Sequence, residues 1–210
     1  MNRLPGVFLA LSFAVAACGA REAEPRIVLA RGWVPRFDTE AQAIDAPRVI
    51  EHADGLEVKP GPNLCLWHPE HSVSGRFRLS VEVTHLDSGL HPHGAGIAFG
   101  GSDVFAAAQR YAYFFVRCDG YFMIKARAGD ETPDVVEWTK HAAVSREDEK
   151  GFARNRLTVE ARAEELLFFV NGTEVHRHKR SELPVDGQYG FRLVHDQHVK
   201  FGTPVVERLE

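Results

Sequence analysis

The sequence lacks the features of several large protein classes. It has no long helical hydrophobic period, no internal repeat and no low-complexity tract, which argues against helical bundles and repeat arrays. The net charge is −4 at pH 7 and no basic block is present, so nucleic acid is not an expected partner. The N-terminal apolar run, residues 6–17, is too short to span a bilayer as a permanent anchor. Cysteine is scarce too, with three among 210 residues.

Signatures of catalysis are missing as well. No Ser-His-Asp setting, Cys-His nucleophile, P-loop or dinucleotide fingerprint is present. A glycosidase needs two carboxyl groups about 5–10 Å apart. The acids on expected strands are interpreted instead as parts of solvated strand faces; they are Glu82, Glu137, Glu160 and Glu174.

The N-terminus has the layout of an export signal. A short positive start with Arg3 precedes the apolar run, which ends in Ala16-Ala17-Cys18. Small residues before a cysteine resemble the lipobox of bacterial lipoproteins, and this resemblance implies that Cys18 becomes the lipidated first residue. The alternative is an ordinary signal peptide cut near residue 17 or 20. We therefore expect a signal peptide over 1–17, a lipidated cysteine and tether over 18–26, and one domain over 27–210.

Both forms of the signal imply an exported protein. The lipoprotein form implies attachment to a bacterial membrane, which in a Gram-negative cell is the outer membrane on its periplasmic side. Gly19 is not the aspartate of the inner-membrane retention signal known from lipoproteins. Cys65 and Cys118 then remain, an even number in an oxidising compartment. Each lies beside an apolar strand, so a disulfide and two buried free thiols both stay open.

Short alternating runs separated by turn residues predict an all-β, antiparallel two-sheet sandwich. Residues 76–86 alternate with period two, not 3.6. Asn171-Gly172 predicts a two-residue hairpin turn, and residues 102–109 are expected to make one helical turn. The expected strands are 27–30, 33–37, 48–52, 56–59, 63–67, 76–86, 95–100, the hairpin 110–127, 135–139, 156–162, 166–170, 173–179, 188–195 and 198–206.

The hairpin Arg110–Arg127 is the strongest motif. Its turn is predicted to be a three-residue loop, Cys118–Gly120, with Gly120 at positive φ, because a two-residue loop would mix apolar and charged residues on both faces. One face is then the predicted core: Ala112, Phe114, Val116, Phe122, Ile124 and Ala126. The other is aromatic and charged, typical of a sugar-stacking surface and also of a solvent-exposed sheet face: Tyr111, Tyr113, Phe115, Arg117, Tyr121, Met123 and Lys125.

The second half of the chain resembles a known fold family. The segments Asn155–Arg162, Phe169–Val175, Gly187–Arg192 and Val199–Phe201, with the hairpin, look like the strands and turns of LamG-like, concanavalin A-like jelly rolls. The branch that they resemble most is named after 3-keto-disaccharide hydrolases. The resemblance extends over roughly Trp33 to Glu207 and implies a jelly roll of two curved sheets with ligands on the concave face.

The chain departs from the pattern of that branch at two motifs. Where the branch has Asn-Ser-Gly-Ile, this sequence reads Gly94-Ala-Gly-Ile97, and where the branch has Tyr-Glu-x-Gln, it reads Tyr111-Ala-Tyr-Phe114. It also lacks the Glu-x-Asp-x-x-Glu strand of laminarinase-type relatives. These losses of polar groups favour a protein without hydrolase activity.

Histidines and loop acids are candidate metal ligands. His91-Pro92-His93 places two imidazoles, the commonest side chains on transition metals, in one expected loop. We expect ordinary surface or hydrogen-bonded histidines and no bound metal, with His91 and His93 as the candidates otherwise. The resemblance to lectin-like jelly rolls also implies a structural Ca²⁺ as an alternative, with Asp87, Asp103 and Asp119 as loop acids of suitable chemistry.

The leading hypothesis is a noncatalytic, lipid-anchored carbohydrate-binding protein, monomeric and without a cofactor. Its tyrosine rings would pack on sugar C–H groups, while Arg117 and Lys125 would donate hydrogen bonds to hydroxyls or carboxylates. One alternative is hydrolysis or elimination at a 3-keto-glycoside, with a rim histidine or Glu82 as base; another is a structural role in the cell envelope. The expected ligand-binding residues are Tyr111, Tyr113, Arg117, Tyr121, Lys125, Trp67, His68 and Trp138.

Overall fold

The computed structural model describes residues 29, 32–38, 47–59, 63–87, 92–195 and 197–210. These residues form fifteen strands and the short 3₁₀ helix η3 (Arg180–Glu182). Within them, no helix has the length and apolar character needed to cross a membrane. The strands are β1 (Val34–Phe37), β2 (Arg48–His52), β3 (Gly55–Lys59), β4 (Leu64–Val73), β5 (Phe77–Asp87), β6 (Ala95–Ser102), β7 (Arg110–Val116), β8 (Tyr121–Ala128), β9 (Asp134–Lys140), β10 (Ala153–Ala161), β11 (Glu165–Val170), β12 (Thr173–Lys179), β13 (Gly187–Leu193), β14 (His198–Gly202) and β15 (Val205–Arg208).

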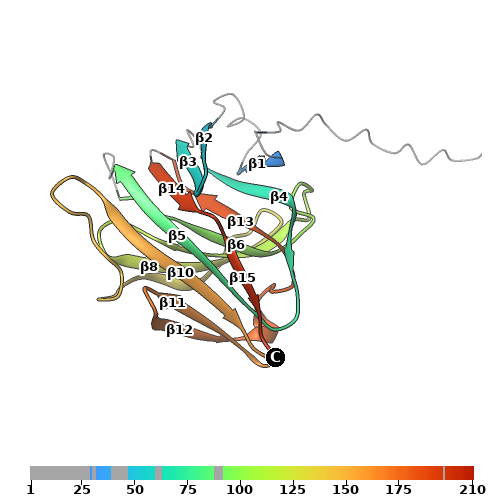
Figure 1. Ribbon diagram of the computed structural model, residues 1–210. Coiled ribbons are helices and arrows are strands. Elements are labelled where there is room, and N and C mark those ends of the chain that lie inside the picture. The colour runs from blue at the N-terminus through green and yellow to red at the C-terminus, as the bar shows by residue number, and fades with distance from the viewer. Residues whose placement is uncertain (1–28, 30–31, 39–46, 60–62, 88–91, 196) are drawn as a thin grey trace, which may run out of the picture.

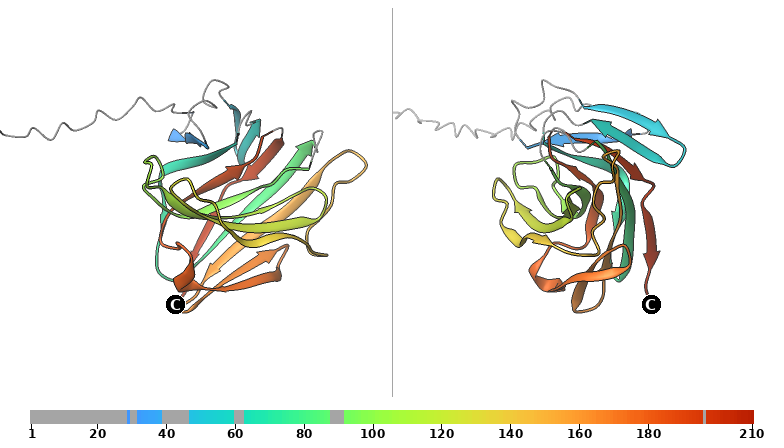
Figure 2. Two further views of the ribbon diagram at one scale, coloured as in Figure 1. Left: turned by 180° about the vertical axis from the view of Figure 1, so that it is seen from behind. Right: turned by 90° about the vertical axis from the view of Figure 1, so that its left-hand side faces the viewer.

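The strands form two antiparallel sheets packed face to face. The seven-stranded sheet has the order β1-β4-β13-β6-β7-β8-β9, and the eight-stranded sheet has the order β12-β11-β10-β5-β14-β3-β2, with β15 also paired to β5. In Figure 1, β5 and β10 pass in front of β6 and β8. Figure 2 shows the layers from two other sides, with the green and yellow strands β6 to β9 of one sheet apart from the orange strands β10 to β12 of the other. The expected all-β, two-sheet jelly-roll sandwich is therefore confirmed.

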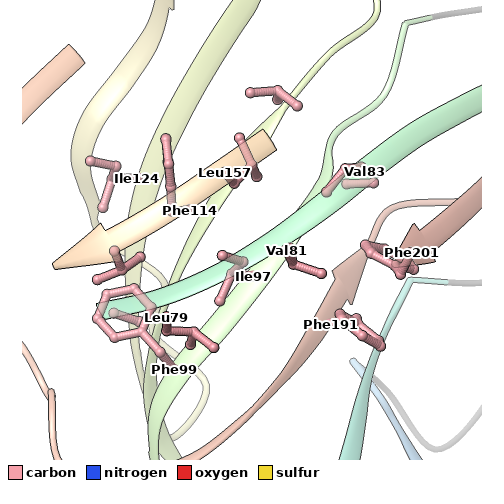
Figure 3. Packing of buried hydrophobic residues seen from close by; sticks show 14 of the residues in the cluster. Leu79, Val81, Val83, Ile97, Phe99, Phe114, Ile124, Leu157, Phe191 and Phe201 are labelled. Carbon is pink, nitrogen blue, oxygen red and sulfur yellow. The ribbon is translucent and has the colours of Figure 1, made fainter. Parts of the chain in front are cut away.

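The main core lies between the sheets and follows from the period-two patterns. Leu79, Val81 and Val83 of β5 are at most 2% exposed, and they face Ile97 and Phe114 of the other sheet (Figure 3). Phe191 and Phe201 stack across the sandwich with ring centroids 4.3 Å apart. Each such side chain contributes about 1.5–3 kcal/mol by leaving water, so the alternation of β5 alone is enough to determine which of its faces is buried.

The hairpin of β7 and β8 forms as predicted. Val116 pairs with Phe122 and Tyr113 with Lys125, which leaves a loop of Cys118, Asp119 and Gly120. Gly120 has φ +96°, a conformation that favours glycine. The predicted core face lies in the main core, where Ala126 is only partly buried.

Four expectations about elements differ from the structure or lie outside it. Residues 103–109 make two consecutive turns rather than a helical turn, with hydrogen bonds from Ala106 N to Asp103 O and from Gln109 N to Ala106 O. The last expected strand is two strands, β14 and β15, because Pro204 between them has no N–H for a ladder. Strand β4 continues past Trp67 to Val73 although it contains Pro69. Proline is tolerated there because the pairing of β4 with β13 is interrupted between Trp67 and Ser72. The expected strand 27–30 falls almost entirely outside the described residues.

The structure decides the state of the two cysteines and the form of the Asn-Gly turn. Cys65 and Cys118 are both buried free thiols. Of the two alternatives, a disulfide or two free thiols, the structure therefore shows two free thiols. Asn171 and Gly172 have φ values of +51° and +82° and connect β11 to β12 as the predicted two-residue hairpin.

Candidate functional site

A hollow of about 610 Å³ lies on the seven-stranded sheet, on the face that points away from the main core. Tyr113, Phe115 and Met123 belong to a second apolar cluster on this face, separate from the cluster between the sheets. The hollow is lined by Asp38, Pro92, His93, Gly94, Tyr113, Phe115, Arg117, Met123, Lys125, Arg127, Asp130, Thr132, Trp138, Arg192 and Val194.

The middle strand of this face, β6, carries almost no side chain there. Gly96 pairs with Arg192 of β13 on one side and with Phe115 of β7 on the other, so these three residues point to the same face. A Cβ on Gly94 would lie 1.9 Å from the ring of Phe115 and 2.9 Å from that of Trp138. Glycine at this position therefore lets the two rings lie against the sheet.

Five aromatic rings form a row along β7. Successive ring centroids from Trp67 through Tyr111, Tyr113 and Phe115 to Trp138 are 5.0–5.9 Å apart. Trp67 and Tyr111 are 0% and 1% exposed because Val104 of the turns after β6 packs into the same cluster. The row is covered at the Trp67 end and reaches the hollow at its Tyr113–Trp138 end.

Arg117 at the rim is fixed by two rings and one carboxylate. Its guanidinium carbon lies 4.7 Å from the ring centroids of both Tyr121 and Trp138, within cation–π range. Its Nε donates a hydrogen bond of 2.9 Å to Asp119, and Nη2 contacts the second oxygen of the same carboxylate. The side chain is thus held in one orientation at the mouth of the hollow.

A buried charge cluster of Asp38, Arg127 and Arg192 forms another wall. Arg192 donates hydrogen bonds of 2.7 Å to each oxygen of Asp38, and Arg127 donates one of 3.2 Å from Nη1 to Oδ1. Burial acts to raise the pKa of Asp38, but the hydrogen bond and charge of Arg192 outweigh it, so this pKa lies below its usual value of 3.8. Asp38 is therefore an ionised anchor for the two arginines and is poorly suited to donate a proton.

The structure brings part of the expected binding set together. Tyr113, Arg117, Lys125 and Trp138 line the hollow. Tyr121 lies beside it as a partner of Arg117. The expectation that Tyr111 and Trp67 offer free ring faces is not met, because both rings are buried in the second apolar cluster. Tyr113 lines the hollow but is also buried, at 4% exposure, with the Arg192 guanidinium 5.3 Å from its ring centroid.

His68 lies in another environment. Its ring centroid is 5.5 Å from that of Trp33 and 4.4 Å from that of His71, and it is not among the lining residues. Leu64, Leu66 and His68 alternate along β4 and so share one face of the strand, and the two leucines lie in the main core. His68 therefore lies on the face of the sheet opposite to the hollow.

Sequence reasoning missed the buried charge cluster. The alternation that places Lys125 on the outer face of the hairpin also places Arg127 there, so this residue could have been found by one further step. Arg192 is a lone charge between Phe191 and Leu193 of β13, which is a weaker signal of the same kind. Asp38 gave none, because it follows the end of β1 and meets the arginines only in three dimensions.

The expected metal ligands do not converge in the described residues. His91 lies outside them. The ring of His93 lies 4.3 Å from that of His195 at the edge of the hollow. Among the described side chains, no group of three or more His, Cys, Asp or Glu residues is placed to share a metal ion. Of the three loop acids considered for Ca²⁺, Asp119 is engaged by Arg117.

Of the positions considered for hydrolase activity, His93 and Gly94 line the hollow, and Gly94 has no polar side chain there. Ala112 and Phe114 point into the main core and are fully buried, so the lost Glu and Gln of the hydrolase pattern have no counterpart on the lined face. Glu82 lies on the eight-stranded sheet, half-exposed and 3.4 Å from Arg154. Ala112, Phe114 and Glu82 therefore supply no catalytic group to the hollow.

No family model matches the chain, and no curated protein matches its sequence. Solved structures do match it. A carbohydrate-binding module, CBM66 from Bacillus subtilis, superimposes with a TM-score of 0.62 at 15% identity, over 87% of this chain and 99% of the module. The fold is a lectin-like jelly roll.

Two further structures agree with this jelly roll. The exoplasmic/lumenal domain of VIP36, solved with Ca²⁺ and Man3GlcNAc, has a TM-score of 0.59 at 10% identity, over 85% of this chain and 84% of that domain. A Bacillus subtilis protein described as having a galectin-like fold has a TM-score of 0.59 at 11% identity, over 77% and 86%. At these identities the likeness concerns the fold alone.

Proposed function

We propose that this protein is an exported, lipid-anchored carbohydrate-binding protein whose ligand occupies the hollow on the seven-stranded sheet. The observation that carries the proposal is the lining itself, where Phe115 and Trp138 meet Arg117, Lys125 and the buried charge cluster. Sugar rings have apolar C–H faces and polar edges, so they are bound where aromatic side chains lie next to oriented hydrogen-bond donors.

The similar structures support the same proposal. One is itself a carbohydrate-binding module, and another was solved with Man3GlcNAc. Binding sites are grafted on folds, so the fold raises the expectation of a saccharide ligand, while the argument for its location rests on the lining of the hollow. We do not propose hydrolysis of 3-keto-disaccharides, because Ala112 and Phe114 supply no polar group and lie in the main core.

A glycan array probed with the chain from Gly19 onward tests binding, and calorimetry on the hits measures it. Trp138→Ala should weaken binding by about tenfold or more, since stacking of one aromatic ring contributes roughly 0.5–1.5 kcal/mol beyond its buried area. Phe152→Ala is the matched control, because Phe152 is an exposed ring outside the hollow. Absence of saccharide binding, or equal binding by Trp138→Ala, would contradict the proposal.

The lipid anchor is a separate part of the proposal and rests on the Ala16-Ala17-Cys18 sequence. In a bacterial host the wild-type chain should fractionate with membranes, and Cys18→Ala should release it or block its processing. Globomycin, which inhibits the lipoprotein signal peptidase, should make the precursor accumulate. A wild-type chain found entirely in the soluble fraction would contradict the anchor and leave the binding proposal intact.

A further inference from the structure

Not every cation of the hollow has an ion-pair partner of its own. Arg117 pairs with Asp119, and Lys125 pairs with Asp134 at 2.9 Å. In the buried charge cluster, by contrast, two guanidinium groups, those of Arg127 and Arg192, share the single carboxylate of Asp38. Among the described residues these three side chains therefore keep one formal positive charge. Asp130 also lines the hollow, but no described ion pair joins it to either arginine.

This excess charge is buried and does not disappear by titration. The side chains of Arg127 and Arg192 are each 7% exposed. Burial acts to lower the pKa of Arg192, but its hydrogen bonds to Asp38 outweigh burial and raise this pKa well above the ordinary arginine value, so Arg192 stays charged. A buried charge without a counter-ion is costly, and an anion on the hollow side would remove that cost.

Arg127 keeps donor groups for such an anion. The Nε of Arg192 also has no hydrogen-bond partner among the described residues, but it is fully buried and out of reach of a ligand in the hollow. Arg127 uses Nε for the carbonyl oxygen of Gly129 and Nη1 for Asp38, and no further partner of its guanidinium lies within the described residues. Both arginines line the hollow, so a ligand inside it can reach this wall.

We propose that the saccharide bound in the hollow is acidic, and that its carboxylate pairs with the buried charge cluster at Arg127. This inference rests on the proposed function and names the class of sugar. A carboxylate is planar and presents two oxygens that match two N–H groups of one guanidinium, the arrangement in which Arg192 already holds Asp38. Its charge of −1 equals the excess of the cluster, while the half-buried Trp138 is left for the apolar ring face.

The test uses one oligosaccharide of a uronic acid and the same oligosaccharide after reduction of its carboxylates to hydroxymethyl groups. Calorimetry with the chain from Gly19 onward should show binding of the acidic form at least about tenfold tighter, as expected for hydrogen bonds to a charged group. Arg127→Gln should remove most of this preference and change the affinity for the reduced form little. Arg127→Lys, which keeps the charge, should retain part of the preference.

Two controls keep the result interpretable. Arg156→Gln removes an exposed arginine of β10 on the opposite sheet and should leave both affinities unchanged. Thermal unfolding of each variant shows whether it is folded. If Arg127→Gln does not fold, the preference for the acidic over the reduced oligosaccharide is compared between the wild type and Arg127→Lys instead.

Each outcome separates the two proposals. Binding of the reduced form as tightly as the acidic form would overturn the acidic-sugar inference and leave carbohydrate binding standing. Equal or tighter binding of a sulfated oligosaccharide of the same length would also overturn it, since a tetrahedral sulfate would then serve as well as a planar carboxylate. If neither form binds and the glycan array is empty, the proposed function itself fails.

Discussion

Arg192 holds Asp38 by two hydrogen bonds of 2.7 Å, one to each carboxylate oxygen, across 154 positions of sequence. The pair joins the segment after β1 to the second-last position of β13. It therefore connects the end of the edge strand β1 to β13, two strands further into the seven-stranded sheet, and it forms one wall of the hollow.

Asp38→Asn should be strongly destabilising. It removes the only described carboxylate that faces two buried guanidinium groups, and breaking a buried ion pair typically costs about 3–5 kcal/mol. Because the folded-state pKa of Asp38 is lowered, its contribution is present above its unfolded value of 3.8 and is lost as the pH falls below that value. Urea unfolding at pH 7 measures the loss. The control Asp54→Asn breaks the exposed pair with Lys200 and should stay close to wild type; equal losses in both variants would contradict the importance of burial.

His85 should make stability fall in mildly acidic solution. Burial lowers its pKa from 6.5 to about 4, so between these values the unfolded chain binds a proton that the folded chain does not, and stability drops as the pH decreases. The loss approaches about 3 kcal/mol, at roughly 1.4 kcal/mol per pKa unit. Burial also lowers the pKa of His71 and His176, so the measurement is the difference in slope between wild type and His85→Gln from pH 6.5 to 4.

The exposed Phe152 provides the control for that slope because it does not titrate. Phe152→Ala should leave the pH dependence of the unfolding free energy unchanged, while His85→Gln should flatten it. If His85→Gln keeps the slope of wild type, the acid sensitivity belongs to other groups.

Substitutions of the glycines under the hollow should separate binding from stability. Gly94→Ala pushes against the rings of Phe115 and Trp138 at 1.9 and 2.9 Å, and overpacking of this kind costs about 1–3 kcal/mol. It should also weaken saccharide binding, because the displaced rings enter the hollow. Gly96→Ala meets backbone, the carbonyl oxygen of Phe114 at 2.2 Å, and should lose more stability than Gly94→Ala.

Thermal unfolding and calorimetry on the same samples check this order. The control is Gly202→Ala on the other sheet, where a Cβ would approach nothing closer than 3.3 Å, and it should leave both stability and binding near wild type. Unchanged binding in a folded Gly94→Ala variant would argue against the hollow as the site.

Cys65 and Cys118 should be unreactive thiols. Burial raises the pKa of Cys118 to about 11 and raises that of Cys65 as well, so little thiolate, the reactive form, is present at neutral pH. In a Cys18→Ser chain, a thiol reagent should detect no reactive cysteine in the folded protein and two after denaturation. Finding none after denaturation without reductant would indicate a disulfide and contradict the structure.

The sequence by itself determined the fold class and the local geometry of its strongest motifs. Period two in β5, the three-residue loop that ends in Gly120 and the Asn171-Gly172 turn are each decided by neighbours in the chain. Such neighbours set the face on which a side chain points and the sign of φ. The core face of the β7–β8 hairpin was predictable for the same reason.

Only the tertiary structure decided which residues of the outer face are accessible and which charges meet. Tyr111 and Tyr113 alternate identically in sequence and both belong to the second apolar cluster, yet only Tyr113 lines the hollow. Asp38, Arg127 and Arg192 come from three segments and share one buried cluster because sheet order brings their strands to one face. Burial and charge pairing depend on contacts between distant segments, and the alternation within a single strand does not encode them.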